Sequence, residues 1–305
     1  MRIGFSLPQV GSVASPRAIV EAAQQAEALG YESLWTLDRL LYPATPQTPY
    51  PATPDGSLPP AFRQVLDPVE TLTFAAAHTT RIALGTSVLD LPYYNPVVLA
   101  RRLTTLDVLS GGRLRVGMGL GWSKDEFDAV GASLSDRGRR ADEFLQVLKA
   151  IWTTNPVEYH GTYYHIPRSF IEPKPVQRPH PPIYLAAYAP AALRRTATVA
   201  NGWNPAGLPL SQMAVTIEQL HGMARGAGRD PGSLEVIVRA NLYLTPQPLG
   251  EDRWVFTGTP DQIKADVAAM KAMPVSELFF DPLFSPGMTT PSAFLTCMKQ
   301  MRELV

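Results

Sequence analysis

The chain has 305 residues, 45% of them hydrophobic and 18% charged, and 27 Lys and Arg residues balance 27 Asp and Glu residues. With no net charge there is no global basic field to hold nucleic acid or an anionic membrane, so we expect a small-molecule partner. The single cysteine, Cys297, excludes an intrachain disulfide and a thiolate metal cluster, as is typical of a reducing compartment. The opening residues lack the apolar core of a signal peptide and no run approaches the roughly 20 apolar residues of a membrane span, which predicts a cytoplasmic protein.

Short β-rich runs alternate with helical stretches along the chain. Amphipathic stretches separate the runs, and the first of them starts with Pro16 and stops at Gly30, as helices commonly do. Eight such alternations predict an α/β fold, a single (β/α)8 TIM barrel over residues 1–305, with functional groups after the C-terminal ends of the strands. The predicted strands, of which the sixth is weak, are residues 2–8, 33–37, 81–89, 113–119, 182–187, 202–206, 234–244 and 277–283.

Two insertions interrupt this order. Residues 41–60, after the second strand, contain seven prolines and cannot form a regular helix or a central strand. We predict that they form a lid over the catalytic face, the alternative being a solvated linker. Residues 155–182, between the fourth helix and the fifth strand, have the pattern of a hairpin around Gly161 and a proline-rich return. His160 and His165 lie in this hairpin without a third ligand at a typical spacing, so we predict no metal.

An acidic residue follows each of three predicted strands. Asp38 follows the second strand, Asp90 the third and Asp281 the eighth. Any one of them alone is more simply explained as the cap of the next helix. Three carboxylates at one rim of a barrel favour a shared site.

Two segments with small side chains adjoin this rim. Gly117, Gly119 and Gly121 follow the fourth strand, but their spacing is not G-x-G-x-x-G, and the acids about 20 residues later lie inside a helix. A nicotinamide-binding domain is therefore not predicted, and the glycines are interpreted as letting a ligand approach the strand end. After the fifth strand, residues 188–192 open a helix at Pro190, where free backbone N–H groups favour phosphate. A tightly packed turn is the alternative there.

Together these segments resemble the luciferase-like monooxygenase class, and most closely its deazaflavin (coenzyme F420)-dependent bacterial branch. The resemblance runs through nearly the whole chain. It implies a flavin-type ring at the C-terminal mouth of the barrel, a homodimer and no tightly bound metal. The segments that carry it are residues 26–39, 81–89, 94–122, 125–131 and 180–203, and "YNP…LAR…TLD.LSGGR" is its specific part.

The resemblance also implies roles for individual residues. Ser87 and Val88 would form a bulge with a non-prolyl cis peptide that supports one face of the ring. The other implied cofactor-binding residues are Asp38 at the polar edge of the ring, Asp90 near the ribityl chain, Leu120 and Gly121 along the cofactor, Asp125 near its tail, and Tyr188, Ala189, Ala191 and Ala192 around the phosphate.

Two positions depart from the sugar-phosphate dehydrogenases of this class. Arg39 stands where those enzymes have a histidine, and Trp122 stands where they have a catalytic glutamate. Neither side chain can transfer a proton comparably near neutral pH, so we do not expect oxidation of a sugar 6-phosphate. We predict Asp38, Arg39 and Trp122 as catalytic residues. Arg39 would be an electrostatic partner for a developing enolate, and Trp122 either a stacking wall or merely packed.

The sequence therefore predicts an F420-dependent oxidoreductase that moves a hydride between C5 of the deazaflavin and a small organic substrate beneath the lid. One alternative is an FMN-dependent monooxygenase that uses flavin reduced by a separate reductase. Another is a non-catalytic flavin-binding protein. No cluster of Lys or Arg along the sequence clearly marks a path for the anionic tail of the deazaflavin.

Overall fold

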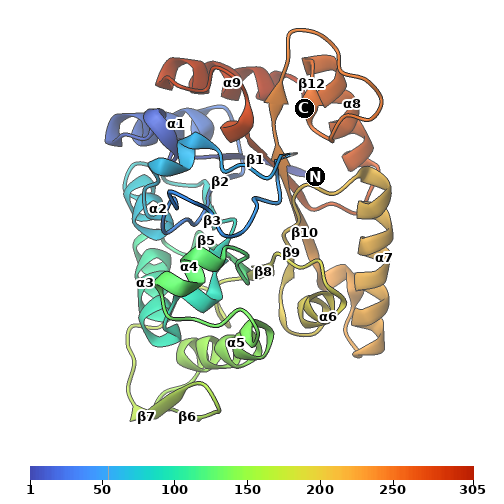
Figure 1. The fold of residues 1–305 in the computed structure, drawn as a ribbon. Coiled ribbons are helices and arrows are strands. Elements are labelled where there is room, and N and C mark those ends of the chain that lie inside the picture. Colours follow the sequence, from blue (N-terminus) through green and yellow to red (C-terminus); the bar gives the residue numbers. More distant parts are fainter. Residues whose placement is uncertain (54) are drawn as a thin grey trace.

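The structure is a computed structural model, and it describes residues 1–53 and 55–305. Within those residues, eight parallel strands close into a barrel that helices surround (Figure 1). Closure comes from the pairing of β3 with β5 and of β13 with β1, so the predicted α/β barrel is confirmed, including its weak sixth strand. In order around the barrel the strands are β1 (Arg2–Ser6), β2 (Ser33–Thr36), β3 (Ala83–Thr86), β5 (Leu114–Gly119), β8 (Ile183–Leu185), β9 (Gly202–Trp203), β10 (Glu235–Asn241) and β13 (Glu277–Asp281).

Two barrel strands are interrupted within the ranges that the sequence predicts for them. The third is interrupted after Thr86, and the chain resumes as β4, which pairs with β5 alone. The seventh ends at Asn241, and β11 then pairs with β12 outside the barrel. The second insertion contains the expected hairpin, made by β6 and β7. These additional strands are β4 (Leu89–Asp90), β6 (Val157–His160), β7 (His165–Ser169), β11 (Tyr243–Leu244) and β12 (Thr257–Gly258).

The α-helices are α1 (Pro16–Ala28), α2 (Pro68–Ala76), α3 (Pro96–Leu109), α4 (Lys124–Ala129), α5 (Arg137–Thr153), α6 (Pro190–Val199), α7 (Leu210–Gly226), α8 (Pro260–Lys271) and α9 (Pro291–Glu303), and short 3-10 helices cover residues 11–13, 60–63, 91–93, 231–233 and 282–284. Five helices begin with the same device, a side chain that accepts a hydrogen bond from the first turn, followed by proline. The capping residues are Ser15, Asp67, Asn95, Thr259 and Thr290. They satisfy backbone N–H groups that have no partner within the helix.

Charged side chains fill the floor of the barrel, which is the end of the interior where the strands begin. Glu277 of β13 is fully buried there and accepts a hydrogen bond from Arg2 Nε at 3.1 Å. Arg115 and Ser33, from two other strands, also donate to its carboxylate. A buried carboxylate needs such partners because its desolvation is costly.

Aromatic side chains fill the layer above this floor. The indole of Trp35 stacks on the ring of Phe279, with ring centroids 4.8 Å apart, and both belong to a buried cluster with Tyr184 and Ile237. Gly85 faces the indole from the neighbouring strand, and a Cβ there would overlap the Trp35 ring. These rings pack the interior at this layer, and a cavity lies above it near the C-terminal ends of the strands.

We expect Gly85→Ala to lower the free energy of unfolding by about 1–3 kcal/mol, because the added methyl group overpacks the layer against Trp35. Gly222→Ala is the matched control: it lies within α7 with nothing within 4 Å of the added carbon, and should raise stability by about 0.5–1 kcal/mol. Urea unfolding of both variants measures the difference. Equal stability of Gly85→Ala and the unsubstituted protein would contradict this packing.

Candidate active site

A cavity of about 280 Å³ lies at the mouth of the barrel, beside the ends of β1, β2, β10 and β13. Its wall includes Leu7, Trp35, Ser87, Arg239 and Asp281. The volume is at the lower end of the range of about 300–1,000 Å³ that is usual for small-molecule sites. The mouth is thus hollowed where the barrel architecture predicts a site.

Two buried carboxyl groups stand next to this cavity. Asp38 accepts a hydrogen bond from Tyr94 Oη at 2.7 Å, and its Oδ2 lies 3.3 Å from the backbone nitrogen of Asp90. Burial raises the pKa of Asp38 to about 6, although the hydrogen bond from Tyr94 opposes this. Burial and the neighbouring charges of Asp38 and Glu126 raise the pKa of Asp90 to about 8. The sequence prediction that these two carboxylates meet at one rim is confirmed.

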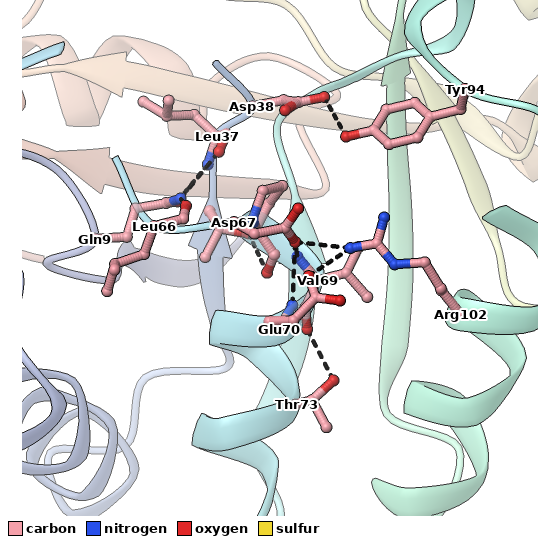
Figure 2. A network of polar contacts seen from close by, with 12 residues as sticks. Gln9, Leu37, Asp38, Leu66, Asp67, Val69, Glu70, Thr73, Tyr94 and Arg102 are labelled. Atoms are coloured by element: carbon pink, nitrogen blue, oxygen red, sulfur yellow. Dashed lines mark hydrogen bonds and ion pairs between the residues drawn. The ribbon is translucent and has the colours of Figure 1, made fainter. Parts of the chain in front are cut away.

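Figure 2 shows how the end of β2 is held so that Asp38 points toward Tyr94. The side-chain amide of Gln9 donates to the carbonyls of Leu37 and Leu66, at 3.0 and 2.7 Å, and its oxygen accepts from the backbone nitrogen of Leu37 at 2.6 Å. Both N–H groups of the amide and one lone pair of its oxygen are used in this tie. Gln9 therefore fixes the backbone next to Asp38 rather than offering a ligand contact.

The peptide bond between Ser87 and Val88 is cis and lies between β3 and β4. This confirms the cis peptide that the family resemblance implies for Ser87 and Val88. The carbonyl of Ser87 accepts a hydrogen bond from Arg239 Nη1 at 3.1 Å, and its backbone nitrogen donates to Thr36 at 2.7 Å. Contacts from two other strands thus hold the interruption in place.

Gly119, the last residue of β5, and Gly121 just beyond it let Asp90 and Val88 come close to the strand. A Cβ on Gly119 would lie 2.6 Å from Val88 Cγ2 and 2.7 Å from Asp90 Oδ1. Gly121 has a φ of +69°, which favours glycine, and its N–H donates to Asp90 Oδ1 at 2.9 Å. The space beside Gly119 is therefore taken by neighbouring protein atoms, whereas the sequence interpretation assigned it to a ligand.

Arg239 of β10 pairs with Asp281 of β13, with 2.5 Å between Nη2 and Oδ2. Asp281 also accepts from Ser6 Oγ and from the backbone nitrogen of Leu283, both at 3.1 Å. The sequence analysis identified Asp281 but missed Arg239. Its signal was an arginine inside the apolar run "VIVRANLYL", because a charge in a buried strand requires a partner.

Arg39 forms a buried ion pair with Glu126 of α4, with 2.8 Å between Nη1 and Oε2. Its guanidinium lies 4.9 Å from the ring centroid of Trp122 and 5.2 Å from that of Phe62, so the two rings enclose it. Tyr93 Oη also donates to Glu126, at 3.1 Å. The sequence analysis missed Glu126, although this residue neutralises the cation that was predicted to face an enolate.

Residues 41–53 and 55–60, which belong to the segment predicted as a lid, contact residues at the mouth. The ring of Tyr50 lies 5.3 Å from that of Trp122, and Gln47 donates to Asp125 twice, at 3.0 and 3.1 Å. Pro54, one of the seven prolines, lies outside the described residues. Asp125 thus holds the lid segment on α4, and its place near a cofactor tail stays a prediction.

The N-terminus of α6 differs from the capped helices. Ala189 occupies the cap position and has no side chain that can accept a hydrogen bond. Ala191 is exposed, and Ala192 lines a small crevice with Leu120, Ala187 and Arg195 at the end of β5. Small side chains therefore leave the first-turn N–H groups of α6 accessible at the rim.

Several arginines lie on α6 and on the first turn of α5, and one of them, Arg195, pairs with Asp142 of α5. Arg195 Nη2 donates to the carbonyl of Gly138 at 2.8 Å, which joins the first turn of α5 to α6. That turn contributes Arg137 and the exposed Arg139, and α6 contributes the exposed Arg194. These residues are far apart in sequence, which is why no basic cluster could be recognised there.

Other predicted features lie away from the mouth. His160 and His165 are cross-strand neighbours with 2.9 Å between their Nδ1 atoms, and His160 Nε2 contacts Glu158. In the part of the chain that the structure describes, no group of three or more His, Cys, Asp or Glu side chains is arranged to hold a metal ion. Across residues 1–53 and 55–305, none of the helices has the length and apolarity to cross a membrane. Cys297 is buried in α9, and burial raises the pKa of its thiol to about 12.

A family model described as luciferase-like monooxygenase matches residues 1–249. An uncharacterised protein of Mycobacterium tuberculosis is 33% identical over 259 residues, which cover 81% of this chain and 89% of that protein. Two relatives with a stated cofactor differ in which one they use. An FMNH2-dependent dimethylsulfone monooxygenase of Pseudomonas putida is 31% identical, and the match covers 50% of this chain and 42% of that protein. An F420-dependent glucose-6-phosphate dehydrogenase of Amycolatopsis mediterranei is 30% identical, and the match covers 67% of this chain and 56% of that protein.

Among solved structures, the monooxygenase RslO1 of Streptomyces bottropensis has the same fold, with a TM-score of 0.81. It is 22% identical, and the match covers 100% of this chain and 98% of that one. At this identity the likeness concerns the fold alone. The comparisons therefore establish a flavin- or F420-dependent oxidoreductase family and leave the choice of cofactor open.

The raised pKa of Asp90 predicts a pH-dependent loss of stability. Because the folded state holds a proton on this carboxyl that the unfolded chain releases near pH 4, the free energy of unfolding should fall as pH rises from about 4 to about 8. The slope from one such group is at most about 1.4 kcal/mol per pH unit. Asp90→Asn should remove this part of the slope in unfolding measurements at several pH values. The exposed Asp252→Asn is the control, and the same slope in Asp90→Asn and the unsubstituted protein would contradict the burial of an ionisable group at this position.

Proposed function

We propose, from the premise that this chain belongs to the luciferase-like monooxygenase family, that it is a coenzyme F420-dependent oxidoreductase acting on a small organic molecule. When bound, the deazaflavin supplies a carbon that donates or accepts a hydride. The observation that carries the proposal is the juxtaposition of three features at one mouth: the buried pair Asp38 and Asp90, the cis peptide at Ser87, and the uncapped N-terminus of α6.

The residues present fit a flavin-type group. Two first-turn donors without a side-chain cap, flanked by alanines, suit a phosphate. The crevice at the end of β5 leads from that terminus toward Gly119 and Leu120. The residues that would hold the group are Asp38 at its polar edge, Ser87 and Val88 against its face, Asp90, Leu120 and Gly121 along its chain, Tyr188, Ala189, Ala191 and Ala192 around the phosphate, and Asp125 toward the tail.

The arginines beside α6 favour the deazaflavin over FMN. F420 carries an anionic tail beyond its phosphate, whereas FMN ends at the phosphate. Arg139 and Arg194 are exposed on the two elements that Arg195 joins, so a tail leaving the α6 terminus would meet positive charge. FMN has no group that reaches this corner.

The carboxyl pair is suited to hold the proton that accompanies a hydride. With a pKa of about 8, Asp90 keeps a proton at neutral pH, while Asp38, with a pKa of about 6, is largely ionised. Tyr94 donates to Asp38 and fixes its orientation. The pair can therefore store one proton in a site that the lid shields from water.

Arg39 and Trp122 are in contact, and we propose that they act together. Because Glu126 neutralises Arg39, its guanidinium is better suited to support the Trp122 ring than to stabilise an enolate. Trp122 packs against the lid residue Tyr50 and against the cluster that contains Val10 and Leu37, which line the cavity. We propose that Trp122 shapes the substrate space and that Arg39 positions it.

A second candidate function is an FMN-dependent monooxygenase supplied with reduced flavin. The P. putida relative with that printed activity and the phosphate-sized site at α6 favour it. A non-catalytic flavin-binding protein would use the same groove without turnover. From the family resemblance we also propose a homodimer with a small-molecule partner.

The test is equilibrium binding of oxidised F420 and of FMN to the cofactor-free protein. We expect tighter binding of F420. The double variant Arg139→Glu/Arg194→Glu should weaken F420 binding by roughly tenfold at low salt and leave FMN binding within twofold, because the reversed charges repel only the tail. Arg225→Glu, an exposed reversal in α7, is the control. Tighter FMN binding, together with substrate-dependent oxygen consumption and an oxygenated product, would overturn the assignment in favour of the monooxygenase.

The phosphate site has its own test. Ala189→Asp should weaken the binding of both cofactors, because a negative charge enters the positive end of the α6 dipole, an effect of about 0.3–2 kcal/mol before repulsion from the phosphate is added. Ala189→Asn, which is similar in size and uncharged, is the control. Equal affinities for Ala189→Asp and Ala189→Asn at low salt would place the phosphate elsewhere.

A further inference from the structure

The cavity at the mouth has walls that are mostly apolar. Leu7, Leu37, Leu283, Met288 and Phe294 contribute side chains around it, and Trp35 lies at its floor. A cavity of about 280 Å³ with such walls favours a compact molecule with a largely apolar body.

Most polar groups in this wall are already engaged. Ser6 donates to Asp281, and Ser285 donates to the carbonyl of Leu242 at 2.9 Å. The amide of Gln9 is used in its tie to the end of β2. Of the polar groups that remain, the guanidinium of Arg239 is the one cationic donor among the lining residues that the structure describes.

Arg239 retains hydrogen-bond donors after its protein contacts are counted. Nη1 donates to Ser87 and Nη2 to Asp281, which uses two of the five N–H groups. Nε is buried and has no hydrogen-bond partner in the described residues. The second N–H groups of Nη1 and Nη2 have no partner in the described residues either, and the side chain is 14% exposed, so an acceptor atom in the cavity can bind these groups.

The charge of this group is compensated. Asp281 pairs with Arg239 at 2.5 Å, and Arg239 is the single cation among the lining residues that the structure describes. An anionic guest would gain from Arg239 but would be repelled by Asp281. An uncharged oxygen accepts a hydrogen bond without that repulsion and costs less to desolvate.

We propose that this cavity is the substrate compartment and that it takes an uncharged, mainly apolar carbonyl compound, or the corresponding alcohol, whose oxygen accepts a hydrogen bond from Arg239. The assignment rests on the proposed function in calling the guest a substrate. Ser87 borders the cavity and also begins the cis peptide that is proposed to support the cofactor ring, so a guest bound to Arg239 would lie beside the residues that would hold that ring. Arg239 is thereby the residue that selects and orients the substrate oxygen.

The experiment measures dissociation constants of three probes with the cofactor-free protein, by ligand-observed NMR titration. The probes are cyclohexanone, cyclohexanecarboxylate and methylcyclohexane, which share a ring and differ in the oxygen and the charge. We expect cyclohexanone to bind at least tenfold more tightly than either of the others. Arg239→Met should weaken cyclohexanone binding about tenfold and leave methylcyclohexane unchanged.

Asp281→Asn provides a second test, in which binding is expected to become stronger rather than weaker. Removing the compensating charge should strengthen binding of cyclohexanecarboxylate by at least tenfold, because Arg239 is then a free cation. Tighter binding of the carboxylate than of cyclohexanone by the unsubstituted protein, an undiminished preference for the ketone in Arg239→Met, or no binding of any probe would each overturn the proposal. The ranking in the unsubstituted protein decides the matter even if a variant does not fold.

Binding of oxidised F420 is measured in parallel. Loss of the expected ketone preference with F420 binding intact overturns the substrate assignment alone. Ketone binding that depends on Arg239, without F420 binding, supports the compartment and overturns the proposed cofactor. The two failures are therefore distinguishable.

Discussion

Burial of charge where the strands end is the constraint on which the organisation of this site depends. Inside the barrel and at its mouth, Glu277, Asp281 and Glu126 are each paired with arginine. Asp38 and Asp90 are equally buried, but in the described residues neither forms an ion pair; they have only a tyrosine hydroxyl and backbone N–H groups as donors. Burial without a counter-charge is what raises their pKa values and distinguishes them from the structural carboxylates.

The two ion pairs at the mouth, Arg239 with Asp281 and Arg39 with Glu126, also fix two separate parts of the site. The pair Arg239 and Asp281 joins β10 and β13 and reaches the carbonyl of Ser87, so it connects the cavity with the cis peptide. The pair Arg39 and Glu126 fixes α4 and the Trp122 ring against which the lid residue Tyr50 packs. Between these two pairs lies the unpaired carboxyl couple. The polar groups of the site are therefore held by strands and by ion pairs before any ligand binds, as preorganisation requires.

The sequence predicted the fold well because its signals are local. Apolar runs such as "ELFFD" and proline-initiated helices each follow from neighbouring residues, and Ala189 before Pro190 indicated an open helix terminus. The break at Ser87 and Val88 came from the family resemblance. Arg239 and Glu126 were missed because their importance lies in partners 42 and 87 residues away, which one sequence does not show. For the same reason, the space beside Gly119 was assigned to a ligand, whereas Val88 and Asp90 fill it.

The function proposed for the mouth depends on the proton that Asp38 and Asp90 store without a compensating cation. The most direct measurement is a titration of 13C-labelled aspartate carboxyls by NMR between pH 4 and 9, with Asp38→Asn and Asp90→Asn to assign the two signals. We expect the Asp90 carboxyl to be still protonated at pH 7 and to titrate near pH 8, and the Asp38 carboxyl to titrate near pH 6. Full ionisation of both carboxyls by pH 5 would contradict it.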